Sequence, residues 1–89
     1  MNTYVLQVYY YTAKGTQYEH MRASNLDNLR KNAIAKYKNE SVAIEVTQTT
    51  ELNKLNFRGT LDIQKGVAHW QTANKNKWSI VDPATGKLR

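Results

Sequence analysis

The sequence predicts one small basic α+β domain over residues 1–89: a single antiparallel (mixed) β-sheet with one helix packed on one face, in the order β-β-α-β-β-β-β. Six segments are rich in β-branched and aromatic residues or alternate between apolar and polar residues, as strands do. One further segment repeats its apolar residues at the helical period. A chain of this length buries about 64 % of its unfolded surface, which is enough for one core.

The first two strands are predicted from residues 3–11 and 17–22. Residues 3–11 contain no glycine or proline, and strand alternation puts one set of side chains on one face: Tyr4, Leu6, Val8 and Tyr10. The opposite face then carries Val5, Gln7, Tyr9 and Tyr11. Residues 12–16 include Gly15 and have the length of a hairpin turn. Residues 17–22 are therefore expected to be the return strand.

The helix is predicted over residues 25–38. Ser24 is a favourable N-cap, and Asp27 follows it in a variant of the capping box. Five apolar positions fall within about 140° of one another on a helical projection: Leu26, Leu29, Ala33, Ile34 and Tyr37. Asp27 and Lys31 have the spacing of a favourable pair. Arg30 borders the apolar stripe, along which we expect its stem to lie.

Four more strands are predicted after the helix. Residues 41–49 alternate cleanly, with Val42, Ile44 and Val46 on one face. Beyond a polar connection at 50–54, residues 55–63 alternate again, and the pattern puts four apolar side chains on the inner face: Leu55, Phe57, Leu61 and Ile63. Gly59 falls on that face and predicts a bulge or a close approach by the helix. Residues 67–72 and 77–81 are the last strands, and a right-handed crossover predicts the local order 2-1-3.

The composition argues against several classes of protein. The chain has no cysteine, which excludes disulfides, zinc–cysteine sites and thiol nucleophiles. No run approaches the roughly 18 apolar residues of a membrane span, and the N-terminus has no secretory signal pattern, so we expect a cytoplasmic protein. No serine lies in a nucleophile elbow, and His20 and His69 have no ligand spacing. We therefore expect no enzyme, no metal and no cofactor.

The charge balance favours a polyanionic partner. The net charge is +6 and the isoelectric point is about 9.7. Residues 65–89 hold five basic residues against Asp82, which leaves a net charge of +4 in this part of the chain. Nucleic acid is the first partner to expect, either DNA or RNA. A charge excess that only keeps the protein soluble is the alternative to a polyanionic partner.

The abundance of Asn, Lys, Tyr and Thr is typical of AT-rich coding sequence and indicates a phage or mobile-element origin.

The predicted function is a non-enzymatic binding module that contacts nucleic acid through its basic C-terminal hairpins. The basic residues expected to contact phosphates are Arg58, Lys65, Lys75, Lys77, Lys87 and Arg89. Trp70 is expected to be exposed beside them, where a base could stack on it. Trp78 is expected to pack in the core with Ile80.

A second hypothesis is a protein-interaction or self-assembling module with no nucleic-acid role. One helix covers only one face of a sheet, so Val5, Tyr9 and Tyr11 are expected on the other face. There they could form the apolar patch of a weak homodimer or stack on bases. They could also simply cover the sheet by packing on their cross-strand neighbours.

Overall fold

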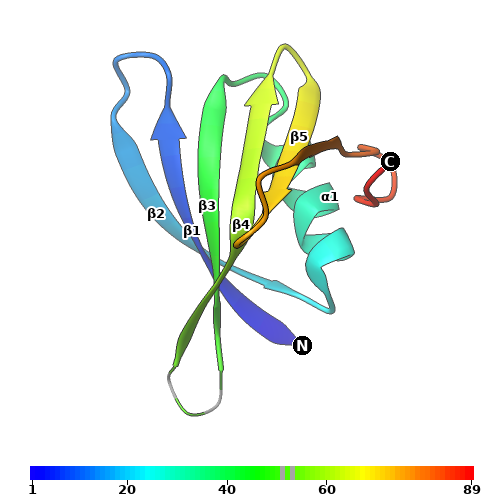
Figure 1. The fold of residues 1–89 in the computed structure, drawn as a ribbon. Helices are drawn as coiled ribbons and strands as arrows, with labels where there is room; N and C mark the ends of the chain where they lie inside the picture. The colour runs from blue at the N-terminus through cyan, green and yellow to red at the C-terminus, as the bar shows by residue number, and fades with distance from the viewer. Residues whose placement is uncertain (51, 53) are drawn as a thin grey trace.

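A computed structural model describes residues 1–50, 52 and 54–89 of the chain. In these residues one helix, α1 (Leu26–Tyr37), accompanies a six-stranded sheet (Figure 1). The strands are β1 (Asn2–Tyr10), β2 (Thr16–Ala23), β3 (Val42–Thr49), β4 (Leu55–Gln64), β5 (Val67–Thr72) and β6 (Trp78–Ile80). All neighbours are antiparallel, in the order β2-β1-β3-β4-β5-β6. The predicted fold class and the local order 2-1-3 are confirmed, while the polar connection predicted at 50–54 includes positions 51 and 53, which lie outside the described residues.

Asn25, rather than Ser24, is the N-cap of the helix, which begins at Leu26. The Asn25 backbone is extended, and its side-chain oxygen accepts a hydrogen bond of 2.9 Å from the backbone N–H of Asn28. Ser24 instead accepts a hydrogen bond from the side-chain amide of Asn28. Both residue types are good N-caps, and the one in extended conformation directly before Leu26 takes the role.

Within the part of the chain that the structure describes, no helix has the length and apolar character needed to span a membrane.

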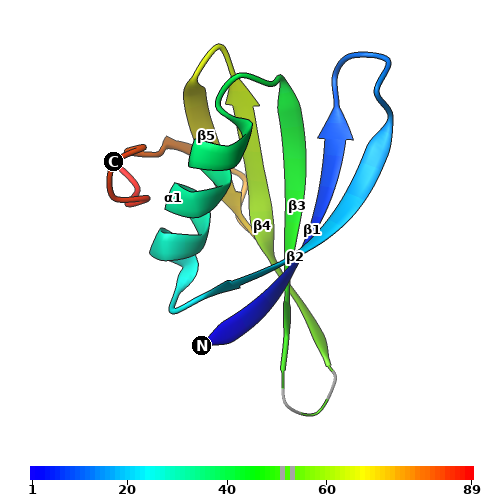
Figure 2. The same cartoon turned by 180° about the vertical axis from the view of Figure 1, so that it is seen from behind.

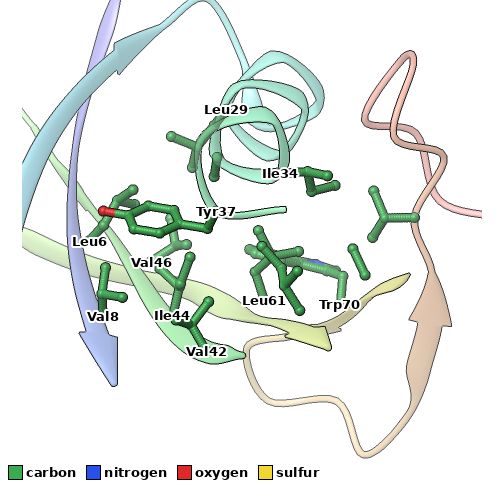
Figure 3. Close-up of a cluster of buried hydrophobic side chains, with 14 of the residues drawn as sticks. Leu6, Val8, Leu29, Ile34, Tyr37, Val42, Ile44, Val46, Leu61 and Trp70 are labelled. Carbon is green, nitrogen blue, oxygen red and sulfur yellow. The ribbon is translucent and has the colours of Figure 1, made fainter. Parts of the chain in front are cut away.

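The core lies between α1 and one face of the sheet (Figures 2 and 3). The helix contributes Leu29, Ala33, Ile34 and Tyr37, each at most 3 % exposed. The sheet contributes the inward residues of β1 and β3, which are Leu6, Val8, Val42, Ile44 and Val46. Leu26 packs at the margin of this cluster. The predicted helix face and its docking surface are confirmed, and the core continues into β4 and β5 through Leu61, Ile63, Ala68 and Trp70.

A bulge in β4 changes which side chains face the helix. Val46 pairs with Gly59 but Thr47 pairs with Phe57, so Arg58 is an extra residue on β4. The extra residue reverses the alternation, and Leu55 and Phe57 therefore lie on the face away from α1, 74 % and 46 % exposed. Their predicted inner placement is wrong. The bulge at Gly59 was correctly predicted.

Gly59 makes a close approach to an indole ring rather than to the helix. Its φ is +152°, and an added Cβ would lie 2.4 Å from Cζ2 of Trp70. A side chain at this position would therefore collide with the core. The predicted approach by the helix is wrong, because the Trp70 ring of β5 occupies the space that Gly59 leaves.

The C-terminal segment returns past β6 and docks on the helix. Val81 bridges to Leu88, and the backbone N–H of Arg89 donates to the carbonyl of Ile80 at 2.9 Å. The Nε of Arg30 donates to the carbonyl of Gly86 at 2.8 Å.

Arg30, which we expected at the border of the apolar stripe with its stem along it, is only 4 % exposed. Its guanidinium lies 5.0 Å from the centre of the Trp70 ring and pairs with Asp27, which replaces the predicted Asp27–Lys31 pair. The docked C-terminal segment covers this group and supplies its carbonyl acceptor.

Candidate nucleic-acid interface

The structure separates the predicted basic residues into several places. Lys75 and Lys77 lie in the connection 73–77 between β5 and β6. Lys65 lies in the turn before β5, and the six residues of β5 put it about 20 Å from that connection. The basic residues predicted as one site are therefore not one cluster.

Of the other three predicted basic residues, Arg58 lies in the bulge of β4, and Lys87 and Arg89 lie in the C-terminal segment after β6. Arg58 is the extra residue of the bulge, where its Nη1 donates to Oε1 of Gln48 at 2.6 Å. Arg89 lies beside Ile80 at the edge of β6, and Lys87 lies in the turn that docks on α1. Of the three, Arg89 is the one adjacent to β6, and β6 follows directly on Lys75 and Lys77.

The two tryptophans have the opposite placement from the predicted one. Trp70 is 1 % exposed: its ring packs in the core against Gly59 and Arg30, and its Nε1 donates to Oγ1 of Thr72 at 2.9 Å. The predicted exposure of Trp70 is wrong, because its register with Leu61 turns it toward α1. Trp78 is paired with Gln71, faces away from the helix and is 45 % exposed. The predicted core position of Trp78 is likewise wrong.

The sheet face opposite α1 is called the open face below, and no helix of the described chain lies on it. Strand register assigns its residues, because directly paired residues share a face and alternate residues along a strand do too. Across the middle of the sheet it carries Tyr18, Gln7, Glu45, Thr60, Gln71 and Trp78. The neighbouring row carries His20, Val5, Thr47 and Phe57.

Phe57, Thr60, Gln71 and Trp78 form what we call the aromatic platform, on the half of the open face made by β4, β5 and β6. Gln71 pairs with Thr60 on one side and with Trp78 on the other, so Gln71 lies on the strand between the two aromatic rings and Thr60 lies on the strand of Phe57. Phe57 and Trp78 are nearly half exposed. The platform therefore combines two accessible rings with an amide and a hydroxyl.

A shallow hollow of about 410 Å³ opens beside Phe57. Most of its lining residues carry an amide, a hydroxyl or an amine, and none of the described ones is acidic: Phe57, Thr60, Gln71, Thr72, Ala73, Asn74, Lys75 and Asn76. The turn that forms its rim is tight, since Asn74 has a φ of +65° and the N–H of Lys75 donates to the carbonyl of Thr72 at 3.0 Å. This geometry holds Lys75 at the rim of the hollow.

The half of the open face on β1 and β3 has a different character. Val5 and Tyr9 are half-buried and Tyr11 is exposed, as predicted for an open face. The carboxylate of Asp62 accepts a hydrogen bond from the Tyr11 hydroxyl, which with partial burial raises the pKa of Tyr11 to about 12. Burial and the charge of Glu45 raise the pKa of Tyr9. Glu45, on β3, and Asp62, on β4, thus lie among the tyrosines; both carboxylates neighbour the platform residue Thr60, and they repel phosphate at that side of the platform.

Known proteins give no further indication of a ligand. Comparison with protein-family models, with curated proteins and with solved structures finds no match to this chain. Among the described residues, no group of three or more His, Asp or Glu side chains is placed to hold a metal ion. The geometry and charge of the open face are therefore the basis of the functional proposal.

Proposed function

We propose that this protein is a nucleic-acid-binding module that uses the aromatic platform, with Lys75 and Lys77 at its end, as its contact surface. The observation that carries the proposal is the position of Lys75, which lines the hollow beside Phe57 on the open face, while Lys77 directly precedes the exposed Trp78 in the chain. The net charge of +4 in residues 65–89 supports it, because this part of the chain includes β5 and β6.

The lysines supply the attraction for phosphate. None of the described residues that line the hollow beside Lys75 is acidic, so no carboxylate among them offsets its charge. Arg89, beside Ile80, extends the basic edge along β6. Lys65 is about 20 Å from Lys75, which is beyond the screening length of about 8 Å at physiological salt. It therefore contributes to the overall field rather than to this contact.

The salt dependence of oligonucleotide binding tests the proposal. Each phosphate contact lowers the slope of log affinity against log salt by about 0.9 for duplex and about 0.7 for single-stranded ligands. Changing Lys75 and Lys77 together to Ala removes about two contacts, so we expect the slope to flatten by about 1.8 or 1.4 respectively. Fluorescence anisotropy with a labelled oligonucleotide at several salt concentrations measures it.

Lys31 and Lys38 provide a matched control, since they are exposed residues at or next to the helix, which covers the other face. Changing both to Ala removes the same charge, and we expect a smaller change in slope. Absence of binding to DNA and RNA at low salt would refute the proposal. Equal loss in both double variants would mean that overall charge, rather than this surface, determines binding.

Self-association through the open face is the second candidate function. In the described part of the chain, seven of the ten exposed large apolar or aromatic side chains lie on this face: Tyr11, Tyr18, Leu55, Phe57, Val67, Trp78 and Ile80. Burying them against a second copy would remove apolar surface from water. Sedimentation velocity at rising concentration checks it, and Tyr9→Lys is expected to shift the equilibrium toward the monomer. A monomer at all concentrations contradicts this candidate.

A further inference from the structure

We propose that the aromatic platform binds single-stranded nucleic acid, with bases stacked on Phe57 and Trp78. This inference rests on the proposed function and specifies its ligand. It starts from the bulge in β4, which turns Phe57 out of the core. Without the extra residue Arg58, alternation would direct Phe57 toward α1. Bulges commonly redirect a side chain next to a binding site.

Both rings are held on strands, so they are available without rearrangement. Phe57 is paired with Thr47 on β3, and Trp78 is paired with Gln71 on β5. The segment that returns past Ile80 hydrogen-bonds to β6 on its outer side and fixes this short strand. Each ring is about 45 % exposed, enough to present a face to a base.

The spacing of the rings favours an unpaired strand. Phe57 is on β4 and Trp78 on β6, so one strand separates them, and Phe57 lies one row further along the sheet, which puts the two positions about 12 Å apart. Bases in a duplex follow one another at about 3.4 Å and stack on each other, so their faces are not available to two rings at this spacing. Bases of an extended single strand are splayed and can stack separately.

The polar side chains beside the rings suit the edges of the bases. Gln71, on the strand between the two rings, offers both a donor and an acceptor, and Thr60, on the strand of Phe57, offers a hydroxyl. Asn74 and Asn76 add amides at the edge of the hollow, and Lys75 adds a positive charge for the backbone. Rings, amides and one cation within a small area form a binding site of the kind that single-strand binders use.

The decisive experiment compares a labelled oligothymidylate with a hairpin duplex of similar charge, at fixed low salt. We expect Phe57→Ala and Trp78→Ala each to weaken binding of the single strand about 5- to 150-fold, with duplex affinity unchanged. Tyr18→Ala is the matched control, because Tyr18 is 68 % exposed on the same face but on β2. The affinity of the Tyr18→Ala variant for the single strand is expected to stay within about twofold of that of the parent. Circular dichroism verifies that each variant is folded.

The outcomes separate this inference from the proposed function. If the lysine variant weakens binding while the two aromatic variants do not, stacking is refuted and phosphate binding at this surface stands. If Tyr18→Ala weakens binding as much as Trp78→Ala, the platform is wrongly placed. If neither ligand binds the parent protein, the proposed function itself fails.

Discussion

Gly86→Ala is expected to detach the C-terminal segment from the helix. Gly86 has a φ of +76°, and an added Cβ would lie 1.8 Å from the carbonyl oxygen of Asp27 and 2.9 Å from the backbone nitrogen of Lys31. Both neighbours are backbone atoms of the helix, so neither can move aside without distorting it. The segment must therefore move away, and the buried Nε of Arg30 loses its carbonyl acceptor.

The expected loss of stability has two parts. The left-handed backbone costs an alanine about 1–2 kcal/mol. Leaving a buried donor without its partner costs about 1–3 kcal/mol. Together these lower the free energy of unfolding by about 2–5 kcal/mol, a large share of the 5–15 kcal/mol typical of a domain. For a chain of this size each kcal/mol lowers the melting temperature by about 4–8 °C.

Gly66→Ala is the matched control for backbone strain alone. Gly66 has a φ of +78°, but nothing lies within 4 Å of an added Cβ. Thermal and urea unfolding of both variants, followed by circular dichroism, give the two losses. Gly86→Ala is expected to lose about 1–3 kcal/mol more than Gly66→Ala. Equal losses would show that the contact between the C-terminal segment and α1 adds nothing to stability.

Two further predictions concern the core. Leu29 and Ile44 are fully buried, so changing either to Ala should lower the free energy of unfolding by about 2–5 kcal/mol. A urea midpoint equal to that of the parent would contradict the core assignment. Burial, and then a hydrogen bond to Glu19, raise the pKa of Tyr37 to about 12 from 10.0. Because the pKa of Tyr37 is raised in the folded state, its contribution to stability is full below pH 10 and is lost as pH rises to about 12. In urea unfolding, the stability of the Tyr37→Phe variant should therefore fall less steeply over this range than that of the parent. An unchanged pH profile would refute the raised pKa of Tyr37.

The sequence predicts the elements and the core of this protein because its helix and first strands have clear periodicity. Leu29, Ile34 and Tyr37 recur at the helical period, and Val42, Ile44 and Val46 alternate. Both patterns follow directly from the need to bury one side of an element. The Asn25 cap is harder to foresee, because Ser24 and Asn25 are adjacent and similar in capping strength.

The exposed aromatic residues could not be placed from alternation alone. A single extra residue, Arg58, reverses the pattern before Gly59, and Phe57 thereby changes face. Gly59 was the available signal, since a glycine within an alternating strand indicates a bulge. The reversal of Trp70 and Trp78 depends on tertiary contacts, because Trp70 fills the space that Gly59 leaves and lies under Arg30.

The central claim is that nucleic acid binds at the aromatic platform and its lysines. Nuclear magnetic resonance of the nitrogen-labelled protein, titrated with oligothymidylate at low salt, tests it at every backbone amide. The account predicts that shift changes concentrate at Phe57, Thr60, Gln71 and residues 74–78, together with the indole N–H of Trp78. Amides on the exposed side of α1, such as that of Lys31, are expected to stay unchanged. Shift changes centred on the helix, or none up to millimolar oligonucleotide, would contradict it.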